Sequence, residues 1–167
     1  MKKLKGLLRF SGIIALALTI VGLVLLMTSY ASVTNKGIGF DKGSSVIFGK
    51  SDGLINERFS SLGFFTFVLA LVAAFFLVLY VALRLMNKEK KRPFLSLVIA
   101  TPLLISGVSV FLAVPKFYES NGYGSFSASG LKLGPGWIVA AILFFVAAII
   151  CIINVLVDKE EPKPSEN

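Results

Sequence analysis

The sequence contains no histidine and only one cysteine, Cys151, and charged residues make up 16% of its 167 residues. Without histidine or a second cysteine, the chain cannot form a Cys/His metal cluster, a histidine-based catalytic set or an internal disulfide. Soluble domains are typically about one quarter charged. The low charge, together with 56% hydrophobic residues, argues against a soluble globular protein and against a disordered chain.

Four uncharged apolar stretches are each long enough to cross a bilayer. They cover residues 10–30, 62–83, 94–114 and 136–157. A hydrocarbon core about 30 Å thick needs about 20 helical residues, and backbone groups within it must bond inside the segment. The predicted fold is therefore an all-α membrane protein. Residues 1–157 are expected to form one four-helix transmembrane bundle, and residues 158–167 a disordered tail.

Residues with positional preferences lie near the predicted helix ends. Ser60 and Ser61 are suited to cap the second helix, and Pro115 is expected just past the end of the third. Pro102 lies inside the third stretch, where its missing N–H favours a packing bend rather than a gate. Trp137 opens the fourth stretch, and its amphipathic ring predicts an anchor at the membrane surface.

The basic residues are unevenly distributed, and their distribution predicts the orientation of the chain. Segments 1–9 and 84–93 contain nine Lys or Arg in 19 residues, whereas segments 31–61 and 115–135 contain six in 52. Positive residues near span ends stay on the cytoplasmic side. We therefore predict a multi-pass plasma-membrane protein with both termini in the cytoplasm and the other two segments outside.

The net charge of +8 indicates this topology rather than binding to nucleic acid. Basic residues close to an anionic membrane surface each contribute about 1 kcal/mol of attraction. The residues that we predict to set the topology and to attract anionic lipid headgroups are Lys2, Lys3, Lys5, Arg9, Lys88, Lys90, Lys91 and Arg92.

The N-terminal segment also has the order of a secretory signal peptide, with basic residues, an apolar run and the small-x-small sequence Ser29-Tyr30-Ala31. Cleavage there would leave three spans. The apolar run covers 18 residues, 10–27, whereas the usual apolar region of a signal peptide has about 7–15. We therefore favour an uncleaved first helix.

Small and hydroxyl-bearing residues recur at the spacing of helix contacts, where they let backbones approach closely. The residues predicted to pack helices, within the bundle or in a homo-oligomer, are Ser11, Ala15, Thr19, Ser109, Ala113, Gly136 and Ala140. Hydroxyls within the stretches are expected to bond to their own helix or to a neighbouring one. Asn154 is expected to bond a neighbouring helix or the interface. Cys151 is interpreted as a small packing residue rather than a lipid-facing thiol.

The two outer segments contain short β-like patterns. Residues 45–48 form an apolar run, and residues 123–128 alternate between two faces next to glycines. The two segments are predicted to pair into a small extracellular sheet. The acids of the first segment, Asp41, Asp52 and Glu57, offer at most a weak Ca²⁺ or lipid-headgroup site.

The order of these features resembles the small, uncharacterised four-span membrane proteins that are common in Gram-positive bacteria. The matching elements are a lysine-led first helix, Val46-Ile47-Phe48-Gly49, a Phe-rich second helix, the basic turn 88–92, and Leu133-Gly134-Pro135-Gly136-Trp137. The resemblance implies no established activity and no catalytic residues. The layout is also similar to that of claudin-type proteins, but the first outer segment lacks the tryptophan and paired cysteines of the claudin signature.

The sequence favours a non-enzymatic integral plasma-membrane protein with a structural, accessory or interaction role. It contains no P-loop, metal-ligand cluster or Ser/His/Asp set, so no cofactor, metal or catalytic residue is predicted. The expected partners are the lipid bilayer and a membrane protein or a second copy of the chain. Two alternatives stay open: a small-solute or lipid transport component, and an immunity- or sensor-like protein that uses its outer loops.

Overall fold

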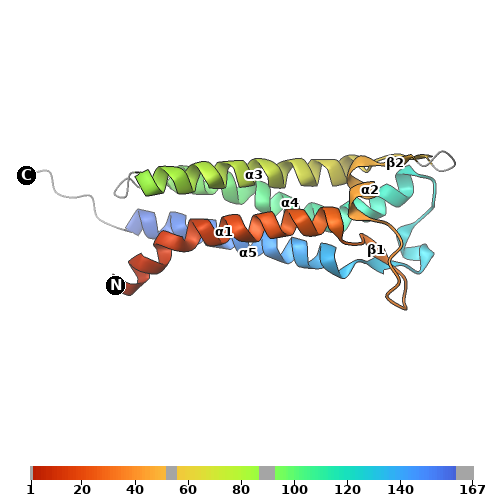
Figure 1. Ribbon diagram of the computed structural model, residues 1–167, viewed down its shortest axis with the longest axis horizontal. Coiled ribbons are helices and arrows are strands. Elements are labelled where there is room, and N and C mark those ends of the chain that lie inside the picture. The colour runs from red at the N-terminus through yellow and green to blue at the C-terminus, as the bar shows by residue number, and fades with distance from the viewer. Residues whose placement is uncertain (1, 52–55, 87–92, 161–167) are drawn as a thin grey trace, which may run out of the picture.

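The computed structural model describes residues 2–51, 56–86 and 93–160 and confirms the four-helix transmembrane bundle. The long helices are α1 (Lys2–Thr28), α3 (Ser61–Met86), α4 (Pro93–Ser120) and α5 (Pro135–Glu160). Figure 1 shows them side by side along the long axis, with the start of α1 and the end of α5 at the same end. Each helix contains an apolar stretch that is long enough to span a membrane, so the chain is a membrane-embedded protein.

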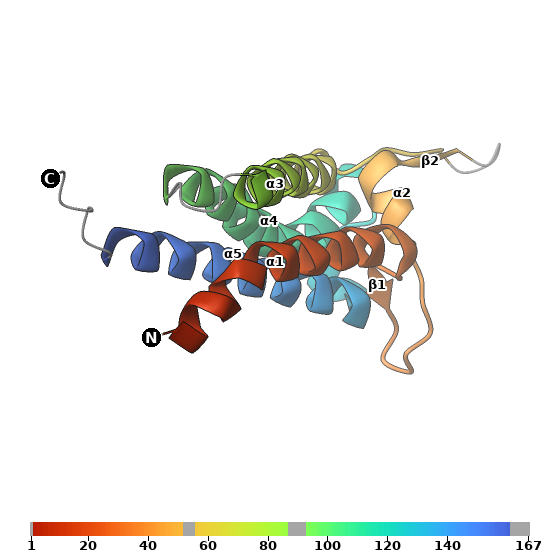
Figure 2. The ribbon, with the colours of Figure 1, turned by 60° about the vertical axis from the view of Figure 1, so that its left-hand side comes forward.

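The four helices form a ring in which α1 packs against α5 and α3, and α4 packs against the same two helices. Alanines let these helices approach closely at the centre, where Ala70, Ala113 and Ala140 are fully buried. Larger side chains, including Leu103 and Phe144, fill the remaining space between the helices. In the second view, Figure 2, α3 is foreshortened whereas α5 lies nearly side-on, so these helices cross at an angle.

Helix α4 is longer than predicted, because it continues through Pro115 and ends at Ser120. The expectation that Pro115 lies past the helix end is therefore wrong. Proline removes one backbone hydrogen bond from a helix interior, at a cost of about 3 kcal/mol. Burial of Phe117 and Tyr118 in the turn that follows offsets this cost. The helix also runs through Pro102.

The connections between α1 and α3 and between α4 and α5 lie together at the end of the bundle opposite the termini (Figures 1 and 2). We call these connections, residues 29–60 and 121–134, the cap. The described elements of the cap are β1 (Ser32–Val33), α2 (Gly43–Phe48), β2 (Lys50–Ser51), β3 (Asn56–Glu57), the 3₁₀ helix η1 (Phe126–Ser129) and β4 (Lys132–Leu133).

The predicted pairing between the two outer segments is confirmed, but other residues form it. Strand β1 pairs antiparallel with β4, so that Ser32 lies opposite Leu133. The β-like residues 45–48 lie in helix α2, and most of 123–128 forms η1 or lies next to it, so both strand assignments are wrong. Val46 and Ile47 are adjacent and both fully buried, which a short helix permits and an alternating strand does not.

The start of α3 follows the predicted chemistry, whereas the end of α5 does not. Ser60 caps α3, because its Oγ accepts a hydrogen bond of 3.1 Å from the N–H of Gly63. Helix α5 continues to Glu160, so residues 158–160 of the predicted tail are helical. The rest of that tail and the basic residues 88–92 lie outside the described residues.

Candidate functional site

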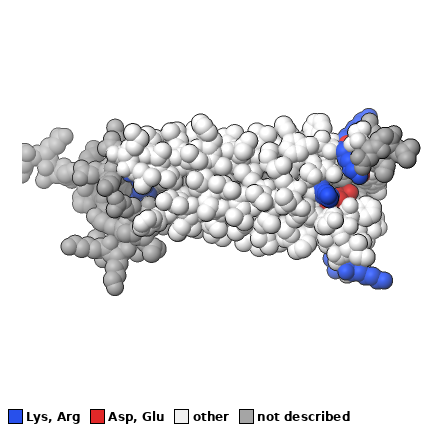
Figure 3. Space-filling model, in the orientation of Figure 1, with Lys and Arg blue, Asp and Glu red and all other residues white. Residues whose placement is uncertain are grey.

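The described charged side chains lie toward the two ends of the molecule. On the face shown in Figure 3, the middle of the bundle has none, and most of them gather at the cap. The four apolar stretches predicted from the sequence contain no charged residue. Among the described residues, the polar side chains that could contact a ligand or partner are therefore concentrated in the cap.

A buried polar cluster joins the cap to the top of the bundle. The side chain of Asp41 is 7% exposed, and its Oδ2 accepts hydrogen bonds from Ser32 Oγ at 2.7 Å and from Tyr118 Oη at 2.6 Å. The two hydroxyls are 3.3 Å apart. We call Ser32, Asp41 and Tyr118 the carboxyl cluster. It links the first outer segment to α4, and it satisfies a carboxyl group that would be costly to bury alone.

Aromatic rings cover the carboxyl cluster on its outer side. The Tyr118 ring meets Tyr123 and Phe126 edge to face, at centroid distances of 5.7 and 5.1 Å. Tyr123 donates a hydrogen bond of 3.0 Å to Glu57 Oε1. Burial and this bond to Glu57 raise the pKa of the Tyr123 phenol, which favours its protonated, donating form. The second outer segment thus covers the first.

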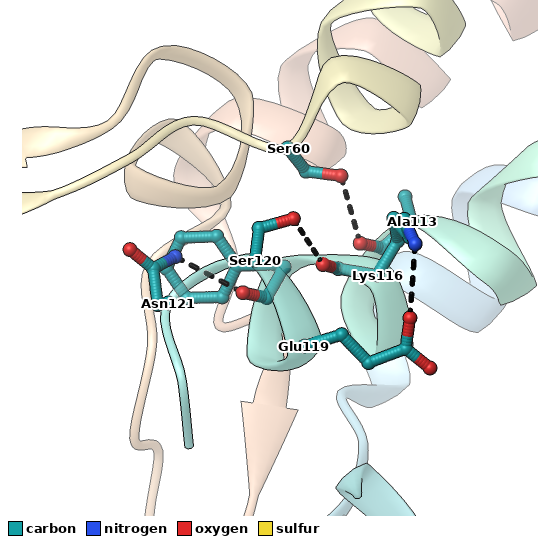
Figure 4. A network of polar contacts seen from close by, with 7 residues as sticks. Ser60, Ala113, Lys116, Glu119, Ser120 and Asn121 are labelled. Atoms are coloured by element: carbon teal, nitrogen blue, oxygen red, sulfur yellow. Dashed lines mark hydrogen bonds and ion pairs between the residues drawn. The ribbon is translucent and has the colours of Figure 1, made fainter. Parts of the chain in front are cut away.

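A second set of bonds fixes the cap to the end of α4 (Figure 4). Asn121 bonds both backbone groups of Arg58: its Oδ1 accepts from the N–H at 2.6 Å, and its Nδ2 donates to the C=O at 2.9 Å. The same Nδ2 also donates to the Phe117 carbonyl. Ser60 Oγ donates to the Ala113 carbonyl at 3.0 Å. These bonds therefore hold residues 58–60, which lead into α3, against the end of α4.

Glycines allow the end of α1 to contact the cap backbone directly. A Cβ at Gly43 would lie 1.7 Å from the Leu26 carbonyl oxygen, and one at Gly134 would lie 1.8 Å from the Tyr30 oxygen. Neither distance is compatible with any side chain. The Gly134-containing motif that opens the fourth helix therefore has a packing role at the α1–α5 contact.

Trp137 does not face the membrane surface, so the interface-anchor prediction is wrong. Its side chain is only 1% exposed and lies inside the bundle next to Gly43. The indole has been drawn into the core because the glycine leaves space beside the end of α1. Its Nε1 has no hydrogen-bond partner among the described residues.

A groove opens on the outer surface of the cap, between α2, the β2–β3 pair and the end of α4. Its volume is about 610 Å³. Its lining includes Phe48, Gly49, Lys50, Glu57, Arg58 and Phe59. Basic and aromatic side chains therefore meet on one open surface, and no sequence pattern predicted this.

The residues predicted to pack helices are placed at helix contacts. Six of them are buried, and Gly136 is partly buried with its backbone against Ser29. The six are Ser11, Ala15, Thr19, Ser109, Ala113 and Ala140. Ser11 Oγ donates a hydrogen bond of 2.8 Å to Asn154 Oδ1, so the expectation that Asn154 bonds a neighbouring helix is confirmed. Cys151 is buried, as its packing interpretation requires.

Three of the span hydroxyls bond as expected. Thr19 and Thr101 donate to carbonyls one turn back in their own helices, and Ser106 donates across to the Thr66 carbonyl at 3.3 Å. Ser96 Oγ is buried without a partner among the described residues, as is Asn154 Nδ2. Ser96 lies near the start of α4 and Asn154 near the end of α5. Both residues therefore lie toward the end of the bundle opposite the cap.

Within the described residues, no three Asp, Glu, Cys or His side chains are grouped in a way that could hold a metal ion. Asp41 and Glu57 instead bond to separate hydroxyl groups, and Asp52 lies outside the described residues. The side chains of Lys2, Lys3, Lys5 and Arg9 also lie outside the described part. No family model, curated protein or solved structure matches the chain.

Proposed function

We propose that the chain is a non-enzymatic accessory protein of the plasma membrane whose bundle holds the cap as an interaction surface. The observation that supports this most directly is the fixed conformation of the cap. The carboxyl cluster and the Asn121 bonds connect both outer segments to α4. Loops that are held in one conformation lose less entropy when they bind a partner.

The exposed face of the cap has the chemistry of a protein contact. Ile38 and Phe40 are each 64% exposed, and they lie two residues apart on one arm of a tight hairpin. Hydrogen bonds from Thr34 N to Ile38 O and from Phe40 N to Ser32 O hold that hairpin in shape. Large apolar side chains presented on an ordered loop are typical of binding surfaces.

The proposed orientation places the cap outside the cell and both termini in the cytoplasm. The excess of Lys and Arg in segments 1–9 and 84–93 supports it. The start of α1 and the end of α5 lie at one end of the bundle, which is compatible with it. The resemblance to four-span proteins of Gram-positive bacteria stays a prediction, and it would place the chain in a bacterial plasma membrane.

Site-specific photo-cross-linking in intact cells tests the interaction role. A photoreactive residue at Phe40 is expected to capture one protein reproducibly. The matched control is Phe75, which is 68% exposed but lies in the middle of α3, and there we expect lipid adducts only. If Phe40 gives only the lipid adducts that Phe75 gives, the cap is not an interaction surface.

Transport is the second candidate, and one observation favours it. Ser96 and Asn154 leave buried polar atoms without partners among the described residues, and such atoms can contact a polar solute. Solute or lipid flux in proteoliposomes that falls on Asn154→Leu substitution would support transport. Flux equal to that of empty liposomes would favour the interaction role.

A further inference from the structure

Among the described residues that line the groove of the cap, Lys50 and Arg58 are basic and Glu57 is acidic. The Glu57 carboxyl group already accepts a hydrogen bond from Tyr123, outside the groove lining. A ligand that enters the groove therefore meets one more basic than acidic side chain in this described lining. This arrangement is complementary to an anion.

The main chain beside Arg58 is fixed before any ligand binds. Both of its backbone polar groups bond to the Asn121 side chain, at 2.6 and 2.9 Å. Asn121 is held in turn by the Phe117 carbonyl of α4. The guanidinium group therefore extends from an anchored backbone at the groove wall, which limits the entropy lost on binding. Arginine suits phosphate because its planar fork donates two parallel hydrogen bonds.

One wall of the groove is backbone at Gly49. This residue has a φ of +80°, and a Cβ there would lie 2.7 Å from the Glu57 carbonyl oxygen. A side chain at this position would be strained and would press on the strand that precedes Arg58. The glycine thus keeps the α2 side of the groove close to that strand.

The other wall is aromatic and leads toward the hydrocarbon. Phe48 and Phe59 line the groove and are half exposed. Both rings contact Phe64 edge to face, at centroid distances of 6.4 and 6.0 Å. Phe64 is exposed in the first turn of α3, one of the four spans. Aromatic surface is therefore continuous from the cationic groove to a membrane-spanning helix.

We propose that this groove binds an anionic phospholipid from the leaflet at the cap end of the bundle. Arg58 and Lys50 bind the headgroup phosphate, and an acyl chain lies over Phe59 and Phe64. A soluble anion has no use for the aromatic wall, and an acidic peptide would not follow Phe64 into the hydrocarbon. The site goes beyond the proposed interaction role. It depends on the membrane-spanning arrangement, and it is independent of which side of the membrane the cap faces.

Lipid titration of the purified full-length protein, followed by native mass spectrometry, tests the proposal. Phosphatidylglycerol is expected to bind more tightly than phosphatidylcholine. Arg58→Gln should weaken phosphatidylglycerol binding roughly tenfold, as the loss of a charged hydrogen bond predicts. The matched control is Lys36→Gln, which removes an exposed cation from the cap outside the groove and should leave binding unchanged.

Two further variants separate the possible outcomes. Lys50→Gln serves as the second variant if Arg58→Gln lowers the unfolding temperature, and it should also weaken phosphatidylglycerol binding. Phe59→Ala should weaken binding of the diacyl lipid but not binding of glycerol phosphate, which distinguishes a lipid from a free phosphate.

Equal lipid binding by the Arg58 and Lys36 variants would overturn the proposal. So would groove-dependent binding of glycerol phosphate or of an acidic peptide that exceeds lipid binding. Neither result alters the cross-linking test of the cap, so the two proposals can fail separately.

Discussion

The bundle and the cap are stabilised by different kinds of contact. In the bundle, small and aliphatic side chains fill the centre, and several threonine hydroxyls bond to carbonyls of their own helix. In the cap, the carboxyl cluster and the Asn121 bonds join segments far apart in the sequence. The cap also brings backbone against backbone at Gly43 and Gly134. The bundle therefore depends on a repeated pattern, whereas the cap depends on individual residues.

This difference predicts where substitutions are tolerated. A contact between two side chains can relax through rotamer changes, but a contact between two backbones cannot. A hydroxyl bonded inside its own helix supports no other segment, whereas loss of the Asp41 carboxyl group removes the acceptor that two hydroxyls of two elements share. Equal-sized changes should therefore cost more in the cap than in the bundle.

The largest effect is expected from Gly43→Ala, because the new methyl group would overlap the Leu26 carbonyl. We expect a loss of more than about 3 kcal/mol of unfolding free energy, or failure to fold. Gly107→Ala is the control within the bundle, since its Cβ would meet only the Phe145 ring at 3.0 Å. The higher helix propensity of alanine, about 1 kcal/mol, offsets that strain. Thermal unfolding in detergent measures both variants, and equal losses would contradict the comparison.

A smaller effect is expected from Asp41→Ala, which removes the acceptor of two hydrogen bonds. Two buried hydroxyls would lose their partner, although they can still bond each other, so we expect a loss of about 2 kcal/mol. Glu119→Ala is the exposed control, because its ion pair with Lys116 contributes little. Limited proteolysis of segment 31–41 gives the local readout. Cleavage at the rate of the unsubstituted chain would show that the carboxyl cluster does not hold this segment.

The smallest effect is expected in the bundle from Ser106→Ala, which removes the bond to the Thr66 carbonyl on α3. Hydrogen bonds between membrane helices average about 0.6 kcal/mol, so the loss should be of that order. Thr101→Val is the control, since Thr101 bonds only within its own helix. A loss at Ser106 that exceeds the loss at Asp41 would reverse the proposed difference between bundle and cap.

The sequence predicted the bundle because hydrophobic length and the absence of charge are sufficient to specify a span. The predicted packing residues, such as Ala15 and Ala140, are buried for the same reason, since small residues at helical spacing mark a contact. The end of α4 could not be predicted in this way. Pro115 usually indicates termination, and its cost is offset by burial of Phe117, which depends on the tertiary structure.

The cap was mostly missed because its contacts are long-range. Asp41 and Tyr118 are 77 residues apart, and nothing local links an outer-loop acid to a tyrosine beyond the expected helix end. The apolar run of α2 has a composition that suits a short strand or a short helix equally well. Trp137 is a residue type typical of membrane-interface anchors, and its burial follows from the space left at Gly43. The glycines at which two backbone segments come into contact, Gly43 and Gly134, were the one local sequence signal for the packing of the cap.

Cysteine accessibility in sealed cells tests the membrane arrangement most directly. The single native cysteine is buried, so Cys151→Ser gives a background for new single cysteines. Lys36→Cys in the cap should react with a membrane-impermeant maleimide in intact cells, whereas Phe75→Cys in the middle of α3 should not. Cysteines added to either terminus should react only after the membrane is permeabilised. Reaction of both termini and the cap from the same side, or of Phe75→Cys as readily as Lys36→Cys, would contradict the four-span account.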